Sequence, residues 1–222
     1  MLASLDDTIT QSGLSRPRYL LAHWQTQRLA RSYADLAASE RYAPATEFFL
    51  ADLYAPRDFS RRDQDGERVV AKMRALLPAR AMAAIQSALH LNRLSQQLDI
   101  GMADMLFGEM GVADIDEVNY AEAYRRCKQF AARREQIVLV DALGHELDAV
   151  VKKPLVQLAL KLAHGPAHLA GLGELQDFLE RGVAAFLHMR GAEVFLATVR
   201  ERESSILARI EAGEPQPFRL DG

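Results

Sequence analysis

The residue types best suited to chemistry are concentrated in segment 47–65, where aromatic side chains are interspersed with charges of both signs. Two adjacent arginines in this segment lie at a predicted helix start, where guanidinium groups and free backbone N–H groups together can hold an anion. Neighbouring carboxylates would then act as bases or fix the geometry of the arginines. The candidate ligand-binding residues are Asp52, Tyr54, Asp58, Arg61, Arg62 and Asp63.

A structural interpretation of the same segment is the stronger of the two. Its apolar residues are typical of core anchors at a junction between two helices. These residues are Phe48, Phe49, Leu53 and Phe59. The charged residues would then be helix caps and exposed ion pairs, each contributing about 0–1 kcal/mol to stability.

A second set of polar residues follows one face of a predicted long helix. The set consists of Arg134, Asp141, His145 and Asp148. Asp141 and His145 are four residues apart, so the carboxylate can orient the imidazole or both can bind one metal ion. A metal site would need ligands from another helix, and no Glu-x-x-His pair occurs in the sequence. We therefore interpret this polar stripe as a solvated helix face.

Two further histidines, in the segment His164-Gly-Pro-Ala-His168, have the spacing of a helical metal clamp. Proline is expected to break the helix on which that spacing depends. The sequence also lacks Walker, G-x-S-x-G, dinucleotide-binding and H-E-x-x-H motifs. We therefore predict no metal site, no cofactor and no catalytic residue.

Helices must position these residues, because strand-forming residues are scarce. The 222 residues include 35 alanines and 31 leucines, against 24 valines, isoleucines and threonines together. Capping residues, prolines and glycines predict about seven helices. These helices are expected at 15–39, 45–54, 60–77, 78–98, 117–151, 167–189 and 192–211.

The predicted fold is a single irregular all-α bundle around a long central helix. That helix, 117–151, would be about 50 Å long at 1.5 Å per residue, and it is apolar on more than one side. Residues 1–14 are expected to form a polar leader, and 15–211 the helical domain. Residues 212–222, with two prolines and few apolar residues, are predicted to be extended or disordered.

Composition also constrains the compartment and the partners. A formal net charge of −3 gives no basis for binding nucleic acid. The single cysteine, Cys127, is typical of a reducing compartment, and the N-terminus lacks the apolar core of a signal peptide. The most apolar window, 137–162, is interrupted by charged residues and a proline. We expect a cytoplasmic protein without a membrane partner.

One motif resembles a known group of proteins. The strings Phe48-Phe49-Leu50, Asp52-Leu53-Tyr54, Asp58-Phe59 and Arg62-Asp63 resemble a motif of uncharacterised bacterial all-helical proteins, and run 171–180 is also similar. The resemblance implies an all-helical fold and no particular activity.

Two functions follow from these observations. The lack of catalytic motifs, the near-neutral charge and the methionine- and leucine-rich segments favour a non-catalytic helical interaction or regulatory protein. Such a protein would act as a homodimer or with a protein partner. The alternative is a protein that binds, or acts on, a small anionic molecule at segment 52–65.

Overall fold

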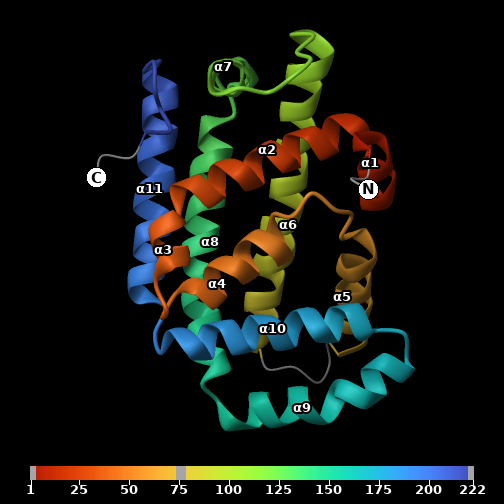
Figure 1. The fold of residues 1–222 in the computed structure, drawn as a ribbon. Coiled ribbons are helices and arrows are strands. Elements are labelled where there is room, and N and C mark those ends of the chain that lie inside the picture. Colours follow the sequence, from red (N-terminus) through yellow and green to blue (C-terminus); the bar gives the residue numbers. More distant parts are fainter. Residues whose placement is uncertain (1–3, 74–78, 220–222) are drawn as a thin grey trace.

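Every regular element among the described residues of the computed structural model is helical, which confirms the all-α prediction (Figure 1). The structure describes residues 4–73 and 79–219. Within these ranges it contains eleven α-helices and two short π-helical segments, more than the seven helices predicted. The additional helices arise because the predicted helices 15–39 and 117–151 are each divided in two, and because Leu5–Ser12 and Pro154–Leu169 also form helices.

The first predicted helix, 15–39, is divided in this way. The chain begins with α1 (Leu5–Ser12), whose first turn is closed by a capping box from Ser4 and Asp7. It then forms α2 (Arg16–Ser32) and α3 (Ala34–Ala38). Tyr33 separates the two with a non-helical backbone (φ −121°, ψ 24°), and its buried side chain faces the core.

The candidate segment 47–65 covers the next elements. Helix α4 (Ala43–Phe48) continues directly into the π-helical segment η1 (Phe49–Leu53), close to the predicted helix 45–54. Helix α5 (Ser60–Met73) follows, and its predicted end at Leu77 lies outside the described residues. The cap of α5 is Asp58, whose carboxylate accepts hydrogen bonds from the backbone and hydroxyl of Ser60.

Helix α6 (Ala79–Ala103) continues past residue 98, where the sequence predicts its end, and leads into the π-helical segment η2 (Asp104–Glu109). The start that the sequence places at Pro78 lies outside the described residues. The methionine-rich end of this unit contributes to the core, where Met102 and Leu106 are fully buried.

The prediction of one central helix over 117–151 was wrong. The chain forms α7 (Glu117–Cys127) and α8 (Phe130–Val151), and Figure 1 shows α7 lying across the end of α8. Lys128 makes the turn in the left-handed conformation, with φ 53°. Because of this turn, α7 packs one of its faces against η2 and α11. If 117–151 formed one straight helix, that face would not meet them. Helix α8 is also not enclosed by its neighbours, since Val138 and Leu147 are exposed.

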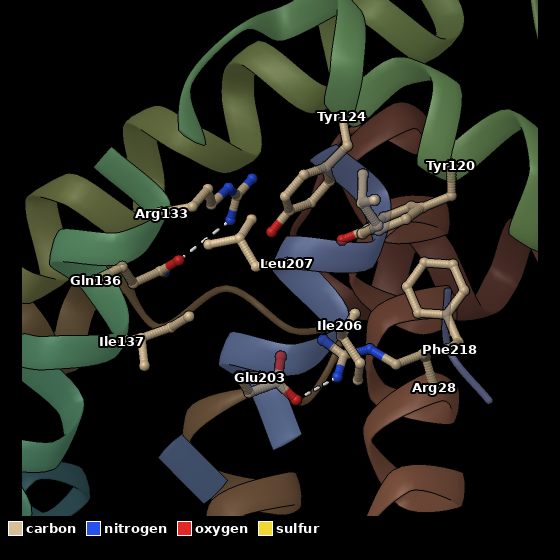
Figure 2. A pocket seen from close by; sticks show the side chains of 11 residues that line it. Arg28, Tyr120, Tyr124, Arg133, Gln136, Ile137, Glu203, Ile206, Leu207 and Phe218 are labelled. Atoms are coloured by element: carbon tan, nitrogen blue, oxygen red, sulfur yellow. Dashed lines mark hydrogen bonds and ion pairs between the residues drawn. The ribbon is translucent and has the colours of Figure 1, made fainter. Parts of the chain in front are cut away.

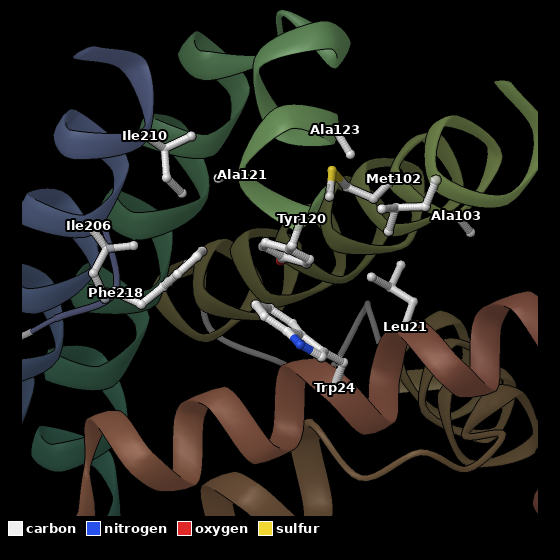
Figure 3. Close-up of a cluster of buried hydrophobic side chains, with 11 residues drawn as sticks. Leu21, Trp24, Met102, Ala103, Tyr120, Ala121, Ala123, Ile206, Ile210 and Phe218 are labelled. Atoms are coloured by element: carbon white, nitrogen blue, oxygen red, sulfur yellow. The ribbon is translucent and has the colours of Figure 1, made fainter. Parts of the chain in front are cut away.

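Two clusters of buried side chains form the core on either side of α2. In the first, Trp24 stacks on Tyr120 of α7, with ring centroids 4.0 Å apart (Figure 3). The second joins α2 and α3 to α4, α10 (Gly173–Met189) and α11 (Glu193–Ala212). Helices α2 and α11 contribute buried side chains to both clusters, and α8 packs along α6, α10 and α11.

Helix α9 (Pro154–Leu169) contains Pro166, so the prediction that Gly165-Pro166 ends this helix was wrong. Proline removes one N–H and leaves the carbonyl four residues earlier without its helical partner. That residue, Leu162, is exposed, so water can hydrogen-bond to its carbonyl. The helix therefore continues to Leu169, and both histidines of the segment 164–168 lie on it.

The C-terminal segment folds back onto the core. Residues 213–219 follow turns, with the side chains of Pro217 and Phe218 buried. The Phe218 ring makes edge contacts with Trp24 and Tyr120, at centroid distances of 5.6 and 5.8 Å. These contacts hold the described part of this segment against the first core cluster.

In the described ranges, none of the helices is by itself long and apolar enough to cross a bilayer. Helices α10 and α11 meet the length and composition criteria only when they are taken together, and they are bent by 103° relative to each other.

Candidate functional site

The junction predicted as a ligand site is an ion-pair network between helices. Asp52, on η1, is buried and accepts hydrogen bonds from Arg181 of α10 at 2.6 and 3.1 Å. Arg57 approaches the same carboxylate at 3.4 Å. Asp52 therefore fixes η1 to α10 and has little capacity left to act as a base.

Arg62 is enclosed in the same network. Its guanidinium lies between the rings of Phe59 and Phe178, 4.2 Å from each ring centroid. It donates to the backbone oxygen of Asp52 at 2.7 Å and pairs with Asp63 at 3.0 Å. These contacts connect α5 to η1 and α10, so the charge of Arg62 is already neutralised.

The remaining members of the predicted set are separated from this network. Asp58 caps α5, and the hydrogen bonds from the Ser60 hydroxyl and N–H lower the pKa of its carboxyl group. Arg61 is exposed and makes no hydrogen bond or ion pair with the described residues. Tyr54 packs against Phe49, and burial raises the pKa of its hydroxyl. The arrangement favours the architectural interpretation of the junction.

The polar stripe on α8 faces α11. Arg134 pairs with Glu211 at 2.8 Å, Asp141 with Arg200 at 3.2 Å, and His145 lies 3.7 Å from Glu193. Asp148 instead pairs with Lys152 on its own helix, at 2.6 Å. The stripe is thus a partly exposed face on which three residues pair with α11 and Asp148 pairs within α8.

A feature that the sequence analysis missed is a small cavity between the helices, lined by both polar and apolar side chains. Its volume is about 40 Å³, enough for roughly three water molecules. Helices α2, α7, α8 and α11 and the C-terminal segment surround it (Figure 2). Its polar lining residues are Arg28, Tyr120, Tyr124, Arg133, Gln136 and Glu203.

One wall of the cavity is a buried ion pair. Arg28 of α2 donates from Nη1 to Glu203 of α11, and the Tyr33 hydroxyl donates to the same carboxylate oxygen at 2.8 Å. The Nε of Arg28 is buried and has no hydrogen-bond partner among the described residues. The pair therefore leaves one donor of a buried cation unsatisfied beside the cavity.

The opposite wall is formed by Arg133 of α8. It donates to the Leu98 carbonyl at 3.3 Å and to Gln136 at 3.2 Å, and its guanidinium lies 4.7 Å from the Tyr124 ring centroid. Figure 2 shows the hydroxyls of Tyr120 and Tyr124 turned into the same space as this guanidinium. Burial raises the pKa of both hydroxyls, so they remain neutral hydrogen-bond donors at neutral pH.

The sequence contains a signal for this ion pair. Arg28 follows Leu21 and Trp24 at the spacing of one helix face, so a cation lies on an apolar stripe. Glu203 likewise lies on the stripe that includes Val199 and Ile206. A charge inside an apolar stripe predicts burial, and burial of a charge requires a partner.

A second notable surface is the leucine stripe of α9, defined here as Leu155, Leu158, Leu162 and Leu169. These side chains are 78%, 53%, 68% and 92% exposed. Helix α9 contains no buried residue and lies at the outside of the bundle, next to α10 (Figure 1). Single exposed leucines are ordinary, but a row of them along one helix is typical of an interaction surface.

Comparison with protein-family models identifies a family for this chain. Residues 5–217 match the model of a family described as a domain of unknown function (DUF8198). No curated protein and no solved structure matches the chain. The match covers nearly the whole chain and supplies no activity.

Proposed function

We propose that this chain, which belongs to the DUF8198 family of unknown function, is a non-catalytic helical protein that self-associates through α9. The observation that carries the proposal is the leucine stripe. Fully burying a leucine side chain contributes about 1.5–3 kcal/mol, so leaving four of them in water forgoes a large stabilisation.

The spacing of the stripe specifies the kind of partner. Leu155, Leu162 and Leu169 are seven residues apart, and Leu158 takes the intermediate position of a heptad. This heptad spacing is typical of knobs-into-holes packing, in which side chains of one helix insert between those of a second helix. The occupant of the stripe is therefore another helix with an apolar seam.

A second copy of the chain provides such a helix. Helices α9 and α10 form a hairpin, with α9 on the outside. Two hairpins related by a two-fold axis would bring the two stripes together as the centre of a four-helix arrangement. Two-fold dimers are the commonest symmetric assemblies, and one self-complementary stripe is sufficient to form one.

Light scattering coupled to size-exclusion chromatography tests this proposal. We expect the wild-type chain to have the mass of two chains, and the double variant Leu158→Glu/Leu162→Glu the mass of one. Both positions are exposed, so circular dichroism of the variant should match that of the wild type. The control is Val118→Glu, at a 72% exposed apolar position on α7, which should remain dimeric. A wild-type chain that is monomeric at high concentration contradicts the proposal.

The cavity favours a second candidate function, the binding of a small anion such as formate or acetate. The unpaired Nε of Arg28 and the hydroxyls of Tyr120 and Tyr124 give the cavity an excess of donors. A carboxylate is an acceptor only and would satisfy several of these donors at once. The volume limits the ligand to a few non-hydrogen atoms.

Thermal unfolding in the presence of formate, acetate or chloride distinguishes the cavity from the junction. At 100 times its Kd, an anion should stabilise the wild type by about 2.7 kcal/mol. We expect Tyr124→Phe to weaken this response and Arg61→Ala to retain it. The opposite pattern would place the anion at segment 52–65, and a flat response in the wild type would exclude an anion site.

A further inference from the structure

The outer surface of α9 and α10 brings two histidines and two carboxylates together. We propose that His164, His168 and Asp177, with Glu180 as a fourth ligand, form a binding site for Zn²⁺. Among the described residues, the first three are the one group of metal-binding side chains whose ligand atoms all lie within 4.8 Å of one another. The site is independent of the leucine stripe and of the cavity.

Each histidine already faces an acidic partner on the neighbouring helix. His164 Nδ1 lies 2.9 Å from Glu180, and His168 Nε2 lies 2.9 Å from Asp177. The imidazoles are four residues apart on α9, with ring centroids separated by 4.7 Å. The carboxylates are three residues apart on α10. One turn of α9 and one turn of α10 therefore supply two ligands each.

Two features hold these ligands in place. Gln176, which is buried, donates to the Leu160 carbonyl of α9 and to the Glu180 carboxylate, both at 2.8 Å. Gly173 allows the His168 ring to lie directly against the start of α10, where a Cβ atom would overlap the imidazole. A buried amide that orients a ligand is typical of the outer shell of a metal site.

The donor set determines the class of ion. Two imidazoles and two carboxylates suit Zn²⁺, whereas calcium and magnesium prefer oxygen ligands alone. Zn–N distances of about 2.0–2.1 Å place tetrahedral ligand atoms roughly 3.3 Å apart. The most distant ligand atoms therefore need to approach one another by up to about 1.5 Å, which rotation of exposed side chains can supply.

The local charge also favours a divalent cation. Asp177, Glu180 and Glu174 lie on the same stretch of α10, and Glu174 and Asp177 line an open depression together with His168 and Arg181. The nearby cation Arg181 is paired with Asp52, so it adds little positive charge to the site. A metal ion would neutralise the two carboxylates that face the histidines.

Titration of untagged protein with Zn²⁺ by calorimetry, and with Co²⁺ by visible spectroscopy, tests the site. We expect one ion per chain and the absorption bands of tetrahedral Co²⁺. His168→Ala should weaken Zn²⁺ binding by about 100-fold or more, and Gln176→Ala by about 10–100-fold. Gly173→Ala, which leaves all four ligands present but displaces His168, should also weaken binding.

The matched control is His90→Ala. His90 and Glu135 form an exposed pair on α6 and α8 at a similar separation of 2.8 Å, and no third ligand group joins them among the residues that the structure describes. This variant should bind Zn²⁺ as the wild type does. The proposal is overturned if the wild type binds no ion, or if His90→Ala and His168→Ala reduce Zn²⁺ binding equally.

Discussion

Replacing Glu203 with alanine is expected to lower the free energy of unfolding by about 3–5 kcal/mol, a large part of the stability of a domain. The variant leaves the guanidinium of Arg28 buried beside the cavity without its carboxylate. The Tyr33 hydroxyl loses its acceptor at the same time. Removing one partner of a buried ion pair lowers the free energy of unfolding by more than the intact pair contributes to it, because the remaining charge is buried without a counter-charge.

Urea unfolding of three variants separates this effect from simple truncation. Arg200→Ala breaks an exposed ion pair on the same helix and should change stability by about 0–1 kcal/mol. The double variant Arg28→Met/Glu203→Leu should recover most of the stability lost in Glu203→Ala, since no buried charge remains. A loss below about 1 kcal/mol in Glu203→Ala would show that water reaches the pair freely.

The fold class was predictable because the periodicity and capping of each helix are local properties. The division of 117–151 was not, because Lys128 adopts a left-handed conformation without a glycine or proline to mark it. Both flanking segments have helical patterns, so the sequence alone joins them into one rod. Only the burial of Tyr120 and its neighbours against distant helices distinguishes a turn from a continuous helix.

The sites were harder to predict for a related reason. Arg28 and Glu203 each stand on an apolar stripe, which indicates burial, but 175 residues separate the two partners. The prediction for the histidine pair was wrong for a different reason. Whether Pro166 breaks the helix depends on whether the carbonyl that loses its helical partner can reach water. Because α9 is exposed, water can reach this carbonyl and the helix continues. Whether a helix is exposed depends on the tertiary fold, which the local sequence does not show.

Alkaline pH is expected to destabilise the protein steeply once it exceeds about 10. Burial is the main factor that raises the pKa of Tyr33 and Tyr120, and Glu203 adds to the effect on Tyr33. In the unfolded chain these hydroxyls ionise near pH 10, while in the folded protein they remain protonated. A raised folded-state pKa contributes stability that is complete below the unfolded pKa and is lost as the pH rises.

The expected slope follows from proton linkage. Each tyrosine that ionises only in the unfolded state lowers the free energy of unfolding by about 1.4 kcal/mol per pH unit. Tyr33, Tyr54, Tyr120 and Tyr124 all have raised pKa values in the folded protein, so together they give about 5 kcal/mol per pH unit above pH 10, which urea unfolding at a series of pH values measures. Tyr33→Phe should remove about a quarter of this slope, because phenylalanine keeps the ring and has no proton to lose. If the variant and the wild type show equal slopes, other groups control the alkaline transition.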